Sequence, residues 1–186
     1  MIRRQARETV LQVLFQLDLS NETEPNAALE RWAAEFSLPE PSLEFARELL
    51  LGTIAYKEGI DAVLSRLTAG WSLERMANVD RNILRLAAFE ILQRPDIPGR
   101  VSVNEAIELA KRFSGEESAK FVNGILDKLL AESSKGTKER QPAAGEGQTT
   151  FSSRNGKHKQ SKGKILPMKK NSIGNSQGAE EQKDEE

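Results

Sequence analysis

The sequence predicts an all-α fold, a compact bundle of about seven helices followed by a tail. Three observations predict this class. Apolar residues recur every three or four positions through most of residues 1–134. No segment shows the sustained apolar/polar alternation of a strand, and proline or glycine separates the periodic stretches. Helices of this length joined by short turns are typical of a compact bundle.

The first half of this region predicts four helices. Pro25 suits the first turn of a helix, where a missing N–H costs nothing. Pro39 and Pro41 separate the second helix from the third, and Gly59 is expected to separate the third from the fourth. The four apolar stripes are Ala6, Val10, Val13, Leu14 and Leu17; Ala28, Leu29, Trp32, Ala33 and Phe36; Leu43, Ala46, Leu49, Leu50 and Ile54; and Ile60, Val63, Leu64 and Leu67. Trp32, Phe36 and Trp71 are interpreted as core residues.

The second half predicts three more helices. Pro95 and Pro98 end the fifth. Ser102 with Glu105, and Ser114 with Glu117, have the spacing of a capping box at a helix start. The three stripes are Val79, Ile83, Leu86, Ala87 and Ile91; Ala106, Ile107, Ala110 and Phe113; and Phe121 or Val122, with Ile125, Leu126, Leu129 and Leu130.

Gly124 lies inside the last predicted helix, where glycine costs about 1 kcal/mol relative to alanine. Close approach of a neighbouring helix would explain it. Asn123 is then expected to be a buried hydrogen-bonding residue that holds this approach.

Charge divides the chain at residue 134. Residues 1–134 carry 16 Lys/Arg and 21 Asp/Glu, a net charge of −5, and residues 135–186 carry 11 and 7, a net charge of +4. The first part is predicted to be a helical domain, and because it is acidic, any nucleic-acid contact by it must come from a local basic patch. The second part is too poor in apolar residues to fold and is predicted to be a disordered tail, basic over 154–170 and acidic at its end.

Composition excludes most catalytic and metal chemistry. The chain has no cysteine, and its single histidine, His158, lies in the predicted tail. No Ser/His/Asp set, phosphate-binding glycine loop or His-containing metal spacing is present, so no enzyme, cofactor or metal is expected. The apolar runs are far shorter than the roughly 18 residues of a membrane helix, and no signal peptide is evident. A cytoplasmic location is the simplest expectation.

Arg3, Arg4 and Arg7 share one face of the first predicted helix, because residues three and four apart are neighbours. Three guanidinium groups there could bind phosphates, although cations oppose the dipole of a helix start. An ordinary solvated surface is the alternative.

Phe113, Lys120 and Phe121 could bind unpaired RNA, since bases stack on aromatic rings while lysine binds phosphate. A core role is the alternative for both phenylalanines. Asp80, Arg81 and Arg85 are expected on a surface turn, where a protein partner could bind.

Several segments together resemble the NusB family of bacterial transcription antitermination factors. Each is weak alone, but all occur in the family's order over about residues 3–131. They are Arg3–Asp18, Val79–Glu90, Ile97-Pro98 before Val101–Ala106, Asn104–Lys111 and Lys120–Asp127.

The resemblance implies two packed helical sub-bundles. It also implies binding to the boxA element of ribosomal RNA leader transcripts, jointly with the small-subunit ribosomal protein NusE. With RNA polymerase and the other Nus factors, this pair supports transcription of ribosomal RNA operons.

Carried to this sequence, the resemblance implies two groups of site residues. The RNA-binding residues are Arg3, Arg4, Arg7, Phe15, Phe113, Glu117, Lys120 and Phe121, and the NusE-contacting residues are Asp80 and Arg81. Tyrosine is common in the family at Phe15, so one hydrogen bond is lost there while stacking remains possible. Gln5 stands within the arginine cluster, where it carries no charge, so weaker phosphate binding is expected. The tail after residue 134 lies outside the family pattern.

Two other functions fit a helical domain of this kind. One is a protein-only adaptor without RNA binding. The other is a stand-alone relative of the helical domain that precedes rRNA cytosine methyltransferases, although this chain has no following α/β domain and no cysteine. The sequence leaves the oligomeric state open.

Overall fold

A computed structural model describes residues 2–20, 22–68 and 71–138, with side chains from residue 3 to residue 134 within these ranges. This part of the chain contains seven α-helices, one short 3-10 helix and no strand. The α-helices are α1 (Ile2–Leu19), α2 (Pro25–Glu35), α3 (Glu40–Ala55), α4 (Lys57–Leu67), α5 (Asn78–Gln93), α6 (Gly99–Phe113) and α7 (Glu116–Lys138), and η1 is Leu73–Arg75. The all-α prediction is confirmed.

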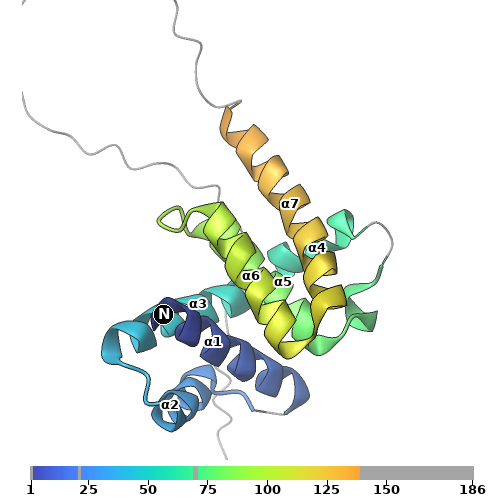
Figure 1. The fold of residues 1–186 in the computed structure, drawn as a ribbon. Coiled ribbons are helices and arrows are strands. Elements are labelled where there is room, and N and C mark those ends of the chain that lie inside the picture. Colours follow the sequence, from blue (N-terminus) through green and yellow to red (C-terminus); the bar gives the residue numbers. More distant parts are fainter. Residues whose placement is uncertain (1, 21, 69–70, 139–186) are drawn as a thin grey trace, which may run out of the picture.

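The helices form the two sub-bundles that the resemblance implied. Helices α1, α2 and α3 pack on one another, and α4 to α7 form the second group, in which α6 and α7 make the most extensive contact. Figure 1 shows the first group at the lower left and the second above it and to the right. α5 joins the groups, because it also packs on α1 and α3.

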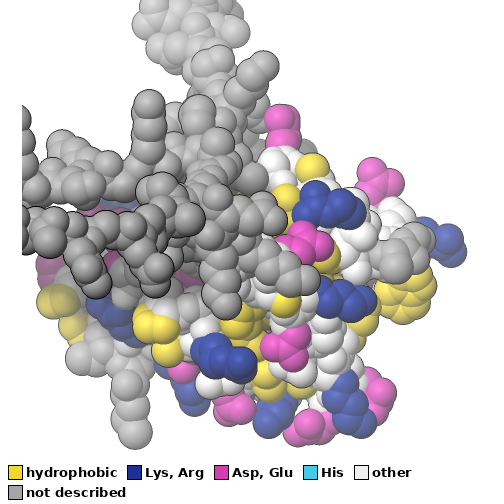
Figure 2. All heavy atoms as spheres, turned by 90° about the horizontal axis from the view of Figure 1, so that it is seen from above, with side chains coloured by type: hydrophobic (Ala, Val, Ile, Leu, Met, Phe, Trp, Pro, Cys, Tyr) yellow, Lys and Arg dark blue, Asp and Glu magenta, His cyan; other side chains and the backbone are white. Residues whose placement is uncertain are grey.

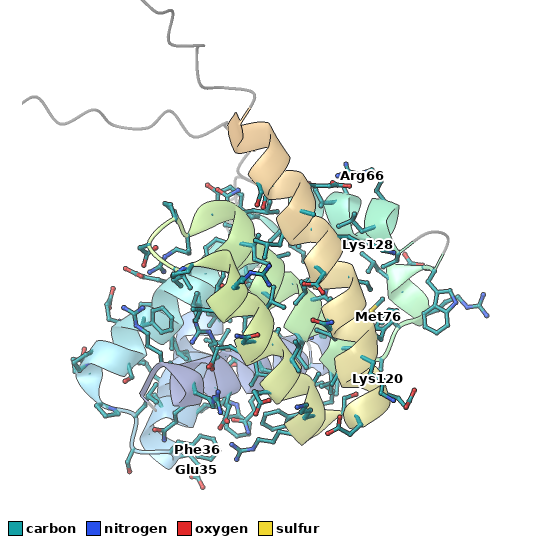
Figure 3. All side chains as sticks on the ribbon, turned by 45° about the horizontal axis from the view of Figure 1, so that its top comes forward. Glu35, Phe36, Arg66, Met76, Lys120 and Lys128 are labelled. Atoms are coloured by element: carbon teal, nitrogen blue, oxygen red, sulfur yellow. The ribbon has the colours of Figure 1, made fainter. Side chains whose placement is uncertain are left out.

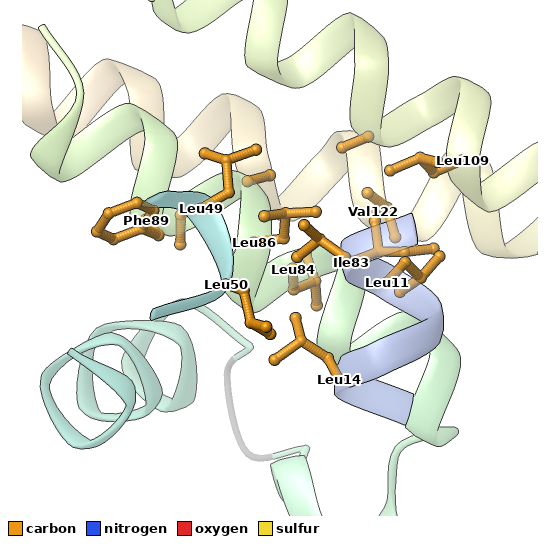
Figure 4. Close-up of a cluster of buried hydrophobic side chains, with 14 of the residues drawn as sticks. Leu11, Leu14, Leu49, Leu50, Ile83, Leu84, Leu86, Phe89, Leu109 and Val122 are labelled. Atoms are coloured by element: carbon orange, nitrogen blue, oxygen red, sulfur yellow. The ribbon is translucent and has the colours of Figure 1, made fainter. Parts of the chain in front are cut away.

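The core runs through both groups without a break. Every residue of α5 from Asn82 to Glu90 is buried. Leu11 and Leu14 of α1 and Leu49 and Leu50 of α3 lie against α5 in the buried cluster of Figure 4, which also contains residues of α6 and α7. Burial of such side chains, worth about 1.5–3 kcal/mol each, therefore holds the two groups together as well as each group alone.

The helix boundaries correct three sequence interpretations. The break after α3 falls at Tyr56, and Gly59 lies inside α4. α6 begins at Gly99, so Ser102 lies within the helix and is buried instead of capping it. α7 begins at Glu116, so Ser114 ends α6 instead of capping α7. Gly115 lies between the two helices with a φ of +105°, which needs glycine, and its N–H donates to the Ala110 carbonyl.

The close helix approach occurs at a different glycine from the predicted one. Gly124 is exposed and a Cβ there would meet nothing within 4 Å, while Asn123 is only half-buried. A Cβ at Gly52 of α3 would instead overlap the ring of Phe89 on α5. The interpretation of Gly124 is therefore wrong, and Gly52 marks the tight α3–α5 contact.

α7 continues to Lys138, past the predicted end of the domain at residue 134. The rest of the predicted tail, residues 139–186, lies outside the described residues, as does the basic segment 154–170. No helix in the described ranges is both long and apolar enough to cross a membrane.

Candidate nucleic-acid interface

The three arginines at the start of α1 do not share one environment. Arg3 and Arg4 are exposed, whereas Arg7 is only 3% exposed. The helix places Arg7 beside the other two, as its spacing requires, but on the side that faces α5 and α6. Exposed cationic groups for phosphate therefore come from Arg3 and Arg4.

Arg7 forms a buried ion pair with Glu90 of α5. Its Nε donates to Glu90 Oε1 at 2.7 Å and its Nη2 donates to Oε2 at 3.0 Å, a two-bonded pairing. Ser102 of α6 donates to the same carboxylate at 2.6 Å. Since α1, α5 and α6 each contribute one member, this polar cluster fixes the position of α1 on the second sub-bundle. The geometry gives Arg7 a positioning role.

Arg4 forms an exposed pair with Glu105 of α6. The Arg4 Nη2 lies 2.9 Å from Glu105 Oε1, and Nε lies 3.1 Å from Oε2. These hydrogen bonds raise the pKa of Arg4 and lower the pKa of Glu105. Exposed pairs contribute at most about 1 kcal/mol, so a phosphate can take the place of Glu105 at little cost.

The aromatic side chain predicted on α1, Phe15, is exposed. Phe113, at the end of α6, is half-buried, and the Arg112 guanidinium lies 5.3 Å from its ring centroid. Both rings therefore have surface available to a ligand, and the second carries a cation beside it.

The start of α7 carries the other predicted RNA contacts. Lys120 and Glu117 are both exposed and form an ion pair of 2.9 Å one turn apart. Phe121 is half-buried and packs on Trp71, with ring centroids 5.6 Å apart. Trp71 is 67% exposed, so the interpretation of this residue as core is wrong. The sequence did contain a sign of this exposure, because Trp71 stands between Gly70 and Ser72, residue types that are typical of surface turns.

Asp80 and Arg81 are less accessible than a surface turn would make them. Asp80 is buried and accepts a hydrogen bond of 3.0 Å from Ser118 of α7, while its Oδ1 has no partner among the described residues. Arg81 is half-buried and donates to the Leu73 carbonyl at 3.2 Å and to the Asn78 side chain. Arg85 is also buried, so the expectation that these three residues lie on the surface is wrong for Asp80 and Arg85.

Asp18, at the end of α1, connects these α5 residues to the first sub-bundle. Its Oδ2 accepts from Arg81 at 3.1 Å, from Asn82 at 3.0 Å and from Arg85 at 3.4 Å. Burial by itself would raise the pKa of Asp18, but hydrogen bonds from Arg81 and Asn82 and the charge of Arg85 outweigh it, and the pKa is lowered. The group borders an open hollow of about 730 Å³ that Trp71 also lines.

Three further hollows follow the exposed side of α1, and Arg4 lines all of them. One extends toward Val101 of α6, one toward Lys111, and one toward Phe36 at the end of α2. Figure 3 labels Phe36 at the edge of the molecule and Lys120 near the start of α7. Phe36 is 40% exposed, so its assignment to the core is wrong.

Charge on the surface is mixed. On the face shown in Figure 2, basic and acidic side chains alternate over the visible part of the described surface. Within the described ranges no group of three or more His, Cys, Asp or Glu residues could hold a metal ion. The candidate interface is therefore a local combination of guanidinium groups and exposed rings, without a broad basic field.

The fold and this surface define a class: an all-helical protein of two joined sub-bundles, with exposed arginines on α1 and α6, an exposed aromatic ring on α1 and half-buried aromatic rings on α6 and α7. The family follows from comparison with known proteins. The NusB family model matches residues 4–131. The chain belongs to the NusB family.

The relatives agree with this assignment in sequence and in structure. The transcription antitermination protein NusB of Desulfitobacterium hafniense is 61% identical over 131 residues, which are 70% of this chain and 88% of that protein. The solved T. maritima NusB superposes with a TM-score of 0.67 at 40% identity, over 74% of this chain and 96% of that one.

A third relative was solved as a complex. The structure of antitermination factors NusB and NusE with double-stranded RNA superposes with a TM-score of 0.65 at 26% identity, covering 70% of this chain and 97% of that one.

Proposed function

We propose that this chain is a transcription antitermination factor, which binds the boxA element of ribosomal RNA leader transcripts together with ribosomal protein NusE. The observation that carries the proposal is the family match over residues 4–131, with curated relatives named transcription antitermination proteins. The chain acts without catalysis, in the cytoplasm, as part of a complex with RNA polymerase and other Nus factors.

Arg3 and Arg4 are the proposed phosphate contacts at the start of α1. Both are exposed, and the ion pair of Arg4 with Glu105 is of the weak, solvent-screened kind. Arg7 acts on RNA indirectly, because its pair with Glu90 fixes the turn that carries the other two.

The proposed base contacts are the rings of Phe15, Phe113 and Phe121. Stacking of an unpaired base on an aromatic ring contributes about 1–3 kcal/mol. Lys120 beside Phe121 supplies a phosphate contact, and Glu117 can accept a hydrogen bond from a base amino group, which favours one sequence over another.

Arg81 and Asp80 are the proposed contacts with NusE, and Arg81 is the more accessible of the two. Asp80 is buried against Ser118 of α7, so a partner would meet Arg81 first. This arrangement couples the NusE-binding region to the start of α7, where Phe121 lies.

Fluorescence anisotropy tests the proposal directly. Labelled boxA RNA and a scrambled control are titrated with the full chain, with and without NusE, at two salt concentrations. We expect a preference for boxA that NusE strengthens. Equal weak binding to both RNAs, unchanged by NusE, would contradict the proposal, and NusE binding without any RNA binding would favour the protein-only adaptor.

A further inference from the structure

A hollow between α1 and the end of α2 has the composition of a nucleobase site. Its volume is about 350 Å³, within the range of about 300–1,000 Å³ that small-molecule sites occupy. Arg4, Gln5, Glu8, Gln12, Phe36 and Arg112 are among the residues that line it. The resemblance assigns no role to Phe36, Gln5 or Gln12.

Local structure fixes Phe36 in an exposed position. Helix α2 ends one residue earlier, and Ser37 turns the chain with φ at +51°, a left-handed conformation that costs a non-glycine residue about 1–2 kcal/mol. The Leu38 N–H donates to the Ala33 carbonyl at 2.8 Å and closes the turn. The Ser37 N–H also donates to the Ala34 carbonyl at 3.2 Å, so this is the usual hydrogen-bonded closure of a helix C-terminus, and it fixes where Phe36 lies.

The side chain of Trp32 also fixes the orientation of the Phe36 ring. The Phe36 ring stacks on Trp32 with ring centroids 5.6 Å apart and an interplanar angle of 11°. Trp32 in turn donates its Nε1–H to Gln16 of α1 at 2.7 Å. Phe36 is therefore an oriented ring that retains 40% of its surface, which is the geometry that a stacked base needs.

Two amide side chains from α1 supply hydrogen-bonding groups beside the ring. Gln5 donates to the Phe36 carbonyl at 3.2 Å, which leaves its side-chain oxygen as an acceptor. Gln12 is half-buried, and its amide makes no hydrogen bond to the described residues. A glutamine amide can donate and accept in one plane and so match the edge of a base such as adenine.

The charges around the hollow favour RNA over an apolar peptide. Two guanidinium groups border it, and both are ion-paired: Arg112 with Glu8, which also lines the hollow, and Arg4 with Glu105. Both pairs are exposed, so a phosphate can replace either carboxylate at little cost. Arg4 also lines the two neighbouring hollows toward α6, so this site is continuous with the proposed phosphate contacts. A strand whose phosphates lie at Arg4 can place the adjoining base beside Phe36.

We propose that this hollow is a subsite for one unpaired RNA base, stacked on Phe36, with its edge read by Gln12 and Gln5 and its phosphate bound by Arg4 or Arg112. The inference rests on the proposed function, because it extends the same RNA-binding surface from α1 and α6 to the end of α2.

The test compares Phe36→Ala with Leu51→Ala in the full chain. Leu51 of α3 is exposed to a similar extent, 38% against 40%, and lines none of these hollows, so its variant is the matched control. We expect Phe36→Ala to weaken boxA RNA binding at least about fivefold, Leu51→Ala to leave it unchanged and Phe36→Trp to retain it within about twofold. Circular dichroism and urea midpoints establish that each variant is folded.

Two more readouts separate the outcomes. RNA carrying 5-bromouridine should photo-cross-link to the peptide that contains Phe36, and Gln12→Ala should reduce the preference for boxA over the scrambled RNA. Wild-type-like RNA binding by Phe36→Ala would overturn the subsite while leaving the proposed function standing. Weaker NusE binding with unchanged RNA binding would make the hollow a protein contact instead, and absence of RNA binding by the natural chain would overturn both proposals.

Discussion

Arg4 and Arg7 are neighbours one turn apart on the same helix, yet their surroundings differ completely. Arg7 is enclosed by α5 and α6 and has a two-bonded carboxylate partner that is 1% exposed. Arg4 has a two-bonded partner as well, but its side chain remains 48% exposed. Removing a buried charge leaves its partner uncompensated, whereas removing an exposed one leaves a partner that water solvates. The same residue type therefore serves stability at Arg7 and stays accessible for the proposed phosphate contact at Arg4.

The largest effect is expected from Arg7→Ala. It leaves Glu90 buried without its ion-pair partner, so the free energy of unfolding should fall by about 3–5 kcal/mol. Urea denaturation followed by circular dichroism measures it. Arg4→Ala is the control and should change stability by less than about 1 kcal/mol. Equal small losses in both variants would show that the buried pair contributes no more to the free energy of unfolding than the exposed pair.

Asp18 tests an intermediate case, a partly buried carboxylate shared by three side chains. Asp18→Asn removes charge-assisted hydrogen bonds with Arg81 and Arg85 and should lower the free energy of unfolding by about 1.5–3 kcal/mol at pH 7. Urea midpoints of the variant and the natural chain give this value.

The pH dependence of stability follows from the lowered pKa of Asp18. Its contribution is present above the ordinary pKa of 3.8 and is lost as the pH falls through the lower value of the folded state. Urea midpoints between pH 7 and pH 3 should therefore fall less steeply for Asp18→Asn than for the natural chain. Parallel curves would assign the acid sensitivity to other groups, among them Glu105 and Asp96, whose pKa values are also lowered.

Arg4→Ala should have its main effect on RNA. Loss of one phosphate contact is expected to weaken boxA binding about fivefold, or about 1 kcal/mol, and to reduce the slope of log affinity against log salt by about one. Anisotropy titrations at several salt concentrations measure both. A weaker affinity with an unchanged salt slope would argue against a phosphate contact.

The smallest change in the free energy of unfolding is expected from Gly124→Ala. Gly124 is open and Gly52 is enclosed, as Arg4 and Arg7 are. Gly124→Ala should raise the free energy of unfolding by about 0.5–1 kcal/mol, because the site is helical and nothing lies within 4 Å of the added Cβ. Gly52→Ala is the control and should lower it by about 1–3 kcal/mol, since the Cβ overlaps Phe89. Thermal or urea unfolding measures both, and destabilisation by Gly124→Ala would contradict the open environment.

Much of the fold follows from short-range patterns. The apolar spacing from Ala6 to Leu17 fixes α1, and the sixth and seventh helices follow in the same way, because a period near 3.6 is a local property of the chain. Proline positions correctly mark the start of α2 and the end of α5. The capping prediction at Ser102 fails because the same spacing also occurs inside helices, and Ser102 is buried within α6. The prediction at Ser114 fails because Ser114 ends α6 and Gly115 stands between it and the start of α7.

The candidate site depended more on tertiary structure. The sequence by itself determined that residues 1–134 are largely helical and that the chain carries no cysteine, and its motifs indicated the NusB family. Only the packing of α5 and α6 against α1 decided which arginine is enclosed, and only the turn at Ser37 decided that Phe36 is exposed. The physical reason is that helical spacing fixes which residues share a face, whereas burial depends on contacts between residues as distant as Arg7 and Glu90.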